Sequence, residues 1–296
     1  MLSRPASRLA AARPLARLLS SAPRRQLSPG ETWDVIRTEA EAGLKTPAFS
    51  RFGMDAFLRA EVLRHETMHG SLAHLIGSKF AANSDSDDYK SSRDGSAVDY
   101  VGAMEAAMEA DPTIMEATVA DLQRFLVVDP ACDGLLGVYL FYKGVQAMVN
   151  ARVSHFYWTE AGGHGKQIAR LLQSEAADVF GVDIHPGATL GRGITVDHAT
   201  GVTIGETGTI GDDVYIMHDV TLGATGMSSE HDRHPKIGNG VFLGAKCTVL
   251  GNITVGDGAV IAAQALVNKP VPPGHTAVGM PAKMLPPRGF DGSAAK

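Results

Sequence analysis

The chain has 296 residues, which is enough for one large domain or two smaller ones. Apolar residues make up 44% and charged residues 20%, an ordinary globular composition that excludes collagen and wholesale disorder. The sequence lacks a run of about 18 uncharged apolar residues, so we expect no membrane span. Two cysteines cannot form a disulfide framework.

Charge divides the chain unevenly. Residues 1–30 carry six arginines and no acidic residue, which leaves 21 basic against 32 acidic residues in the remainder. Nucleic-acid binding needs a positive surface, so this acidic body argues against it. Arginines spaced among Ala, Leu and Ser are typical of an organelle transit peptide. We expect residues 1–30 to be a disordered mitochondrial transit peptide, with a plastid peptide or a basic tail on a cytoplasmic protein as alternatives.

The next part of the chain has a helical pattern. Apolar residues such as Trp33, Ile36 and Ala40 recur at three- and four-residue spacing. The Asp-Pro pairs at Asp111 and Asp129 have the form of helix starts, with Asp as the N-cap and Pro at the first helical position. The sequence therefore predicts a helical domain over residues 31–180.

From Gly181 onward the apolar period changes to six. A two-residue phase slip separates two such series, and a third follows a longer excursion. Because six matches neither a helix nor a simple alternation, this period predicts a parallel β-helix over residues 181–269. The positions in frame are Ile184, Leu190, Val196 and Val202, then Ile204, Ile210, Ile216 and Leu222, then Ile237, Leu243, Val249, Val255, Ile261 and Val267.

Two segments depart from the repeat. Leu222 and Ile237 are fifteen residues apart rather than twelve, so residues 223–236 should bulge out as a loop, a common place for functional residues. Residues 270–296 begin with a proline-rich stretch, which predicts an extended strap that leaves the solenoid, followed by a tail. Six-residue sides cannot bury both of their faces, which favours packing against copies of the same chain.

The histidines of the repeat region indicate chemistry. His198 lies in Asp197-His198-Ala199-Thr200-Gly201 at the phase slip, where its side chain need not point inward. Asp183 precedes it by fifteen residues, which should place the carboxylate near the adjacent rung. An imidazole backed by a carboxylate is a competent general base near neutral pH. The alternative is that each histidine is a solvated rung residue, which the Arg233-His234 pair in the loop disfavours.

These motifs together resemble serine O-acetyltransferase, within the hexapeptide-repeat acyltransferase superfamily. The resemblance covers about residues 31–287 and includes the helical part. It implies an α+β fold with an N-terminal all-helical domain followed by a left-handed parallel β-helix of hexapeptide repeats. The segments that carry it are Leu63–Leu75, Ala110–Pro112, Asp183–Pro186, Asp197–Gly201, Gly205–Thr207, Asp232–Lys236, Pro270–Pro273 and Gly279–Ala282.

The resemblance implies an activity: acetyl-CoA gives its acetyl group to the hydroxyl of L-serine, the first step towards cysteine. His198 would remove the serine proton, Asp183 would orient His198, and attack on the thioester would be direct. Arg233 and His234 would hold the serine carboxylate. Residues implied at the serine ammonium are Asp197 and Asp111, and residues implied along acetyl-CoA are Ala224, Thr225, Ala245 and Lys236.

The resemblance also implies partners. We expect trimers through the solenoids, paired into hexamers through the helical domains, with cysteine as a feedback inhibitor and no metal. Association with O-acetylserine sulfhydrylase is left unsupported, because Ser293–Lys296 does not match the long isoleucine-terminated tail of the family.

Other functions stay open on the residues alone. A zinc hydratase of the γ-carbonic-anhydrase kind shares the solenoid and could use histidine ligands. An acyltransferase with another acceptor, such as homoserine or an amino sugar, and a catalytically dead scaffold are further alternatives. The histidines available to zinc are His185, His198, His218 and His234.

Overall fold

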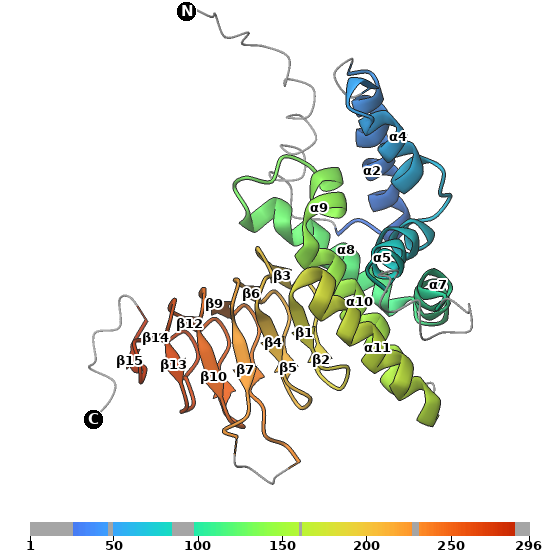
Figure 1. Ribbon diagram of the computed structural model, residues 1–296. Helices are drawn as coiled ribbons and strands as arrows, with labels where there is room; N and C mark the ends of the chain where they lie inside the picture. Colours follow the sequence, from blue (N-terminus) through green and yellow to red (C-terminus); the bar gives the residue numbers. More distant parts are fainter. Residues whose placement is uncertain (1–25, 47–49, 85–97, 160–161, 227–230, 288–296) are drawn as a thin grey trace, which may run out of the picture.

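The structure is a computed structural model that describes residues 26–46, 50–84, 98–159, 162–226 and 231–287. The predicted transit peptide up to residue 25, residues 227–230 of the predicted loop, and the tail from residue 288 lie outside the described residues. Helices occupy the first part of the chain and a three-sided prism of short strands the second, which confirms the predicted fold class (Figure 1).

The helical domain begins two residues before the expected boundary. Ser28 accepts a hydrogen bond from the backbone of Glu31, whose side chain accepts one from Ser28 N, and this capping box starts α2 at Pro29. No helix in the described part of the chain combines the length and apolarity that crossing a membrane requires. The helical elements are α2 (Pro29–Leu44), α4 (Met54–Leu58), η1 (Arg59–Leu63), α5 (Met68–Ser84), α7 (Tyr100–Ala110), α8 (Thr113–Val128), α9 (Leu135–Phe141), α10 (Lys143–Thr159) and α11 (Gly162–Phe180).

The two Asp-Pro pairs behave differently. Asp111 ends α7, and its carboxylate accepts a hydrogen bond from Thr113 N at 3.0 Å; a helix does follow at once, but its N-cap is Pro112 rather than the predicted Asp111. Asp129 also caps the end of a helix, α8, and accepts a hydrogen bond from Ala131 N at 2.8 Å, but the next helix begins only at Leu135. The helix start predicted at Asp129 is therefore wrong, because its carboxylate stabilises a turn that ends one helix rather than beginning another.

The prism has three parallel sheets, which we call its first, second and third sides (Figure 1). The buried aliphatic residues of the six-residue series point into it; Ile204, Ile210 and Ile216 are each about 1% exposed. The first side holds β1 (Val182–Ile184), β4 (Val202–Ile204), β7 (Thr221–Gly223), β10 (Thr248–Leu250) and β13 (Leu266–Val267). The second side holds β2 (Thr189–Leu190), β5 (Thr209–Ile210), β8 (Lys236–Ile237) and β11 (Thr254–Val255). The third side holds β3 (Thr195–Val196), β6 (Tyr215–Ile216), β9 (Phe242–Leu243), β12 (Val260–Ile261), β14 (Thr276–Val278) and β15 (Lys283–Leu285).

Strand register explains the irregularities of the repeat. A regular coil needs eighteen residues, as in the pairing of Thr203 with Thr221. The first coil needs twenty, since Val182 pairs with Val202, and this is the predicted phase slip. Leu222 and Ile237 lie on consecutive sides, where six residues suffice, so the loop inserts nine residues rather than the three inferred from sequence.

The predicted strap does not leave the prism at Pro270. Val271 donates a hydrogen bond from its backbone to Thr254 O at 2.9 Å, and β14 pairs with β12 before β15 reverses direction beside it. The correction has a simple cause: the prolines flank Val271 and leave its backbone N–H free to pair.

A buried ion pair joins the helical domain to the first coil. Arg152 on α10 contacts Asp121 on α8 at 2.6 Å, and the two side chains are 7% and 1% exposed. Arg152 also donates to Gly191 O, while Asp121 accepts from Ile194 N. Burial raises the pKa of Asp121 to about 6 although Arg152 opposes the shift. Removing one partner of such a pair typically costs about 3–5 kcal/mol, so these contacts fix α8 and α10 on the prism.

Candidate active site

The first half of the candidate site is an exposed turn between the third and first sides. We call this turn, Asp197–Gly201 together with the stacked turn Met217–Val220, the His198 edge. His198 and Ala199 have φ values of 60° and 61°, a left-handed backbone that turns the chain sharply. The His198 side chain is 68% exposed, as the sequence predicted for a residue at the phase slip.

Polar groups surround His198. Its Nε2 lies 3.5 Å from Oδ2 of Asp197, which also accepts a 2.9 Å hydrogen bond from the Tyr215 hydroxyl. Burial and this bond to a carboxylate raise the pKa of Tyr215. The Tyr215 hydroxyl thus holds the Asp197 carboxylate in place, while the His198 ring beside it remains exposed to solvent.

His218 is a member of this edge to which the sequence assigned no catalytic role. Its ring lies 5.7 Å from that of His198, edge to face, and its buried Nδ1 has no hydrogen-bond partner among the described residues. Beside the edge is a hollow of about 560 Å³. It is lined by Asp129, Ala131, Phe141, Tyr142, Lys143, Gly144, Val196, Asp197 and His198.

The second half of the candidate site is the corner between the first and second sides. We call its stacked turns, His185–Ala188, Gly205–Gly208 and the described part of the loop 223–236, the His234 edge. Here the histidine is buried: His234 is 7% exposed. A Cβ atom on Gly205 would overlap the imidazole, so the ring needs a glycine beneath it.

Thr207 organises the His234 edge. Its hydroxyl oxygen accepts hydrogen bonds from the backbone N–H groups of Arg233 and His234, both at 3.1 Å. Its own backbone N–H donates to Nδ1 of His234 at 3.2 Å, so a neutral ring carries its proton on Nε2. Burial lowers the pKa of His234, and the nearby positive charges of Arg233 and Lys236 lower it further.

Charged and aromatic groups complete the edge. Arg233 forms an ion pair with Glu206 at 3.1 Å. His185 packs edge to face on Trp158 at 4.9 Å, and its Nδ1 accepts from Gly187 N. The motif Gly205-Glu206-Thr207 was visible in the sequence, but the support that Glu206 and Thr207 give to Arg233 and His234 was not.

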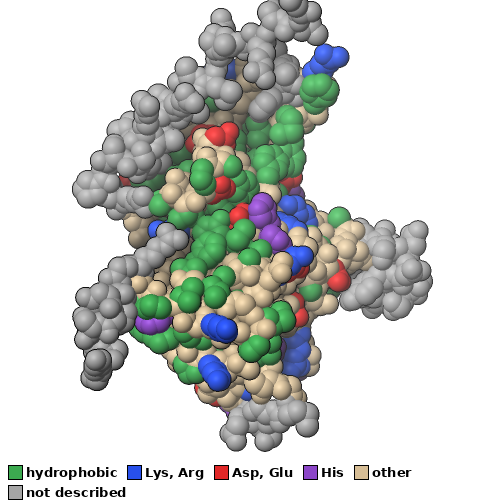
Figure 2. All heavy atoms as spheres, turned by 90° about the vertical axis from the view of Figure 1, so that its left-hand side faces the viewer, with side chains coloured by type: hydrophobic (Ala, Val, Ile, Leu, Met, Phe, Trp, Pro, Cys, Tyr) green, Lys and Arg blue, Asp and Glu red, His purple; other side chains and the backbone are tan. Residues whose placement is uncertain are grey.

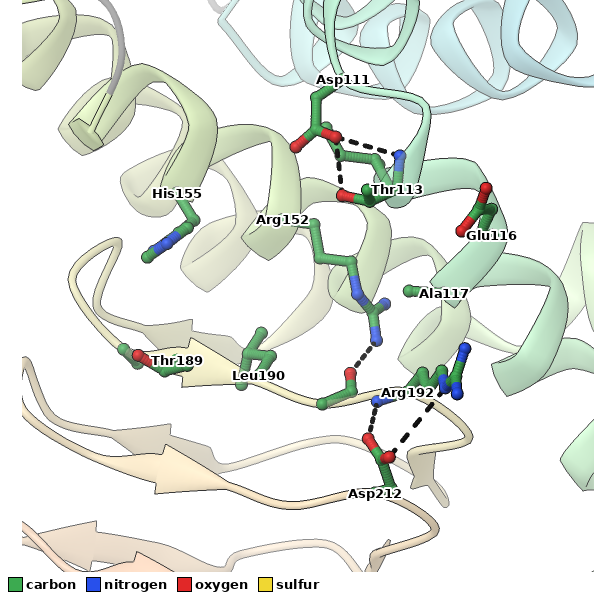
Figure 3. A pocket seen from close by; sticks show the side chains of 13 residues that line it. Asp111, Thr113, Glu116, Ala117, Arg152, His155, Thr189, Leu190, Arg192 and Asp212 are labelled. Atoms are coloured by element: carbon green, nitrogen blue, oxygen red, sulfur yellow. Dashed lines mark hydrogen bonds and ion pairs between the residues drawn. The ribbon is translucent and has the colours of Figure 1, made fainter.

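Asp111 lies in a separate pocket of about 390 Å³ between the helical domain and the second side (Figure 3). Its carboxylate accepts hydrogen bonds from Thr113 N and from the Thr113 hydroxyl. His155, in the same pocket, donates from Nδ1 to Pro186 O at 2.7 Å and so connects the pocket to the His234 edge.

Asp183 stands apart from both edges. It is exposed in the middle of β1 and accepts a 2.6 Å hydrogen bond from Gln173. Within the described residues of one chain, no hydrogen bond or ion pair joins Asp183 to His198. The catalytic pairing of these two residues stays a prediction.

The residues expected along acetyl-CoA fall on both edges. Ala224 and Thr225 follow β7 on the His234 edge, and Ala245 follows β9 one coil above His218. Lys236 is engaged within the chain: it forms an ion pair with Asp232 at 2.5 Å and donates to Thr207 O.

Metal ligation by the histidines of the prism finds no support within one chain. None of His185, His198, His218 and His234 belongs to a cluster of three or more potential ligands among the described residues.

Comparisons with known proteins agree over most of the chain. Residues 32–149 match the family model described as serine acetyltransferase, N-terminal, and residues 234–269 match the model for bacterial transferase hexapeptide (six repeats). A rice protein (Oryza sativa subsp. japonica) named "Probable serine acetyltransferase 1" is 43% identical over 255 residues, which are 86% of this chain and 79% of that protein.

Solved structures give the same result. Soybean serine acetyltransferase complexed with serine is 38% identical with a TM-score of 0.76, over 89% of this chain and 100% of that one. The serine acetyltransferase of Brucella abortus strain S19 in complex with coenzyme A is 35% identical with a TM-score of 0.76, over 88% and 97% of the two chains. With its helical domain and hexapeptide prism, this chain therefore belongs to the serine acetyltransferases, a family of acyltransferase enzymes.

Proposed function

We propose that this enzyme transfers the acetyl group of acetyl-CoA to the hydroxyl of L-serine by direct attack, with His198 as the general base. The products are O-acetylserine and CoA. The relatives bound to serine and to coenzyme A support both substrates. The observation that carries the mechanism is the exposed imidazole of His198 on a sharp left-handed turn, 3.5 Å from a carboxylate oxygen of Asp197.

The reaction balances without a covalent enzyme intermediate. His198 accepts the proton of the serine hydroxyl while the oxygen attacks the thioester carbonyl, forming a C–O bond. The tetrahedral intermediate then collapses, the C–S bond breaks, and the sulfur of CoA leaves with the electron pair. The imidazolium returns its proton to that sulfur, which regenerates neutral His198.

One chain cannot enclose a serine molecule between its two edges. The His198 and His234 edges border opposite ends of the first side, where the strand Val202–Ile204 separates Gly201 from Gly205. At about 3.3 Å per extended residue, these four steps span roughly 13 Å, more than twice the length of serine. The site is therefore completed by a second copy, whose His234 edge packs against the His198 edge of the first.

A threefold arrangement achieves this pairing. Rotation about an axis parallel to the prism keeps equal coils at equal heights. His198, which follows the first coil, then faces the first two coils of the neighbouring copy, where Asp183, His185 and Glu206 lie. In this assembly the Asp183 carboxylate of the neighbour orients His198, and a second contact through the helical domains pairs two trimers.

Charge complementarity positions the serine. Arg233, held by Glu206, binds the substrate carboxylate, and His234 donates to it from Nε2. Asp197 and Asp111 bind the ammonium group. Recognition of both charged ends orients a ligand with few other features, and cysteine, which shares both ends, competes for the same position.

Acetyl-CoA occupies the groove between neighbouring prisms. The small side chains of Ala224 and Ala245 let the backbone approach the pantetheine arm. The exposed Lys246 and Lys269 supply positive charge for the phosphates. Figure 2, which views the molecule from the C-terminal end of the prism, shows a few lysine and arginine side chains there.

The test is thiol release from acetyl-CoA with L-serine, with L-homoserine and without an acceptor. We expect release with L-serine far above the other two reactions. Faster thiol release with L-homoserine would show that homoserine, not serine, is the preferred acceptor. Equal release in all three reactions would contradict acetyl transfer to an acceptor.

A further inference from the structure

A cluster of metal-ligating side chains lies in the helical domain, away from the candidate active site. It consists of His69 on α5 and of Glu105 and Glu109 on α7. One potential ligand atom from each lies within 4.8 Å of the other two. It is the one such cluster of three that the described part of the chain contains.

The helices hold these side chains together. Glu105 and Glu109 are one turn apart and project from the same face of α7. The two helices pack closely, because a Cβ on Gly77 of α5 would lie only 2.8 Å from Val101 N of α7. A Cβ on Gly70 would lie 3.2 Å from Oε1 of Glu105, so the glycine after His69 leaves room for that carboxylate.

The distances suit a small divalent cation. Zinc bonds to histidine nitrogen and carboxylate oxygen at about 2.0–2.2 Å, which separates tetrahedral ligand atoms by about 3.3 Å. Nε2 of His69 is already 3.7 Å from Oε1 of Glu109. Glu109 is exposed and Glu105 is half-buried, so the carboxylate of Glu109 in particular is open to solvent and to an added ion. The Thr67 hydroxyl lies 3.3 Å from Nε2 of His69, so a further polar oxygen is close to the three ligand atoms.

Charge favours an added cation. None of the described lysine or arginine side chains forms an ion pair with Glu105 or Glu109, and the one charged contact is the His69–Glu109 pair. Two carboxylates one helical turn apart repel each other. A divalent ion between them would turn that repulsion into attraction and would join α5 to α7.

We propose that His69, Glu105 and Glu109 form a binding site for a first-row divalent transition-metal ion, with Zn²⁺ as the probe. One imidazole and two carboxylates are ligands that such ions accept, with water at the open position. The site braces the helical domain and takes no part in acetyl transfer, so it is independent of the proposed function.

The test uses the full chain after treatment with a chelator. Zn²⁺ is titrated at pH 7.5 against a chromophoric chelator, for the wild type, His69→Ala, Glu109→Gln and the control His164→Ala, which removes an exposed histidine of α11. We expect the wild type and the control to bind one Zn²⁺ per chain. Both cluster variants should bind this ion at least about tenfold more weakly.

Thermal unfolding gives a second readout without enzyme activity. Because a ligand that binds the native state raises the midpoint, Zn²⁺ should raise it in the wild type and in His164→Ala and less in His69→Ala. Equal zinc binding by His69→Ala and the wild type, or no tight zinc binding by the wild type, would overturn the proposal.

Discussion

The two edges of the first side are built in opposite ways. On the His198 edge the histidine is 68% exposed and its carboxylate neighbour is fixed by Tyr215. On the His234 edge the histidine is 7% exposed and Thr207 fixes both its backbone and its ring. A base must reach a substrate proton, whereas a recognition group gains from being held in place before the ligand arrives. The difference in burial therefore matches the division of labour that we propose.

Removal of the exposed base should have the largest effect. We expect His198→Ala to lower kcat by about 10²–10⁴-fold, because a positioned general base contributes that much. The variant should still assemble, since the side chain lies outside the core. Steady-state kinetics with size-exclusion chromatography provides the measurement, and His164→Ala is the control. Wild-type turnover in His198→Ala would remove the proposed mechanism.

Loss of the guanidinium on the other edge should act on binding. Arg233→Ala should raise the KM for serine by about 10–100-fold, because a hydrogen bond to a charged group contributes about 1.5–3 kcal/mol. The KM for acetyl-CoA should stay close to the wild-type value. If the KM values for both substrates rose equally, Arg233 would have a structural role rather than a role in serine recognition.

Crowding the buried ring tests how rigid the His234 edge is. In Gly205→Ala the added methyl would overlap the imidazole of His234, so we expect a loss of about 1–3 kcal/mol in the free energy of unfolding. Gly163→Ala is the matched control, since nothing lies within 4 Å of the added Cβ. Urea denaturation of both variants is the measurement. An unchanged midpoint for Gly205→Ala would show that the ring moves freely.

The smallest expected effect is a pH dependence of stability. The pKa of His234 is lowered in the folded chain. At pH values below about 6.5, the ordinary pKa of a histidine, the unfolded chain therefore binds more protons than the folded chain. The stability that neutral His234 contributes is fully present above about pH 6.5. It decreases as the pH falls towards the pKa of the folded chain, by at most about 1.4 kcal/mol per pH unit. Urea midpoints between pH 7.5 and 5.5 should therefore fall less steeply for His234→Gln than for the wild type. Equal slopes would contradict the assignment.

The sequence predicted the prism better than its edges. A six-residue period directly reflects residues that stack inside a coil, so the strand positions followed from Ile204, Ile210 and their equivalents. The period does not reveal which corner a residue occupies, so it placed Asp183 near the rung of His198 without showing whether the two side chains meet. In the structure Asp183 accepts a hydrogen bond from Gln173, and its catalytic pairing with His198 stays a prediction.

Other features had no sequence signal of their own. Asp121 and Arg152 are charged residues of a kind usually found on the surface, and only tertiary packing makes them a buried ion pair. Thr207 acts through three hydrogen bonds to Arg233 and His234. The loop with its nine-residue insertion separates these residues from Thr207 in the sequence, so the spacing gave no sign that they meet. The prolines around Val271 suggested that the chain leaves the prism there. That prediction failed because the number of prolines does not show that Val271 between them still has a backbone N–H available for pairing.

The central claim is that each site combines the His198 edge of one copy with the His234 edge of another. Co-expression of His198→Ala and Arg233→Ala chains with different tags, followed by isolation of mixed assemblies, tests it directly. In a random equal mixture, about one site in four receives both native edges, so at low serine we expect about a quarter of the wild-type kcat/KM. If one chain formed the whole site, the mixed assemblies would show only the average of the two single variants.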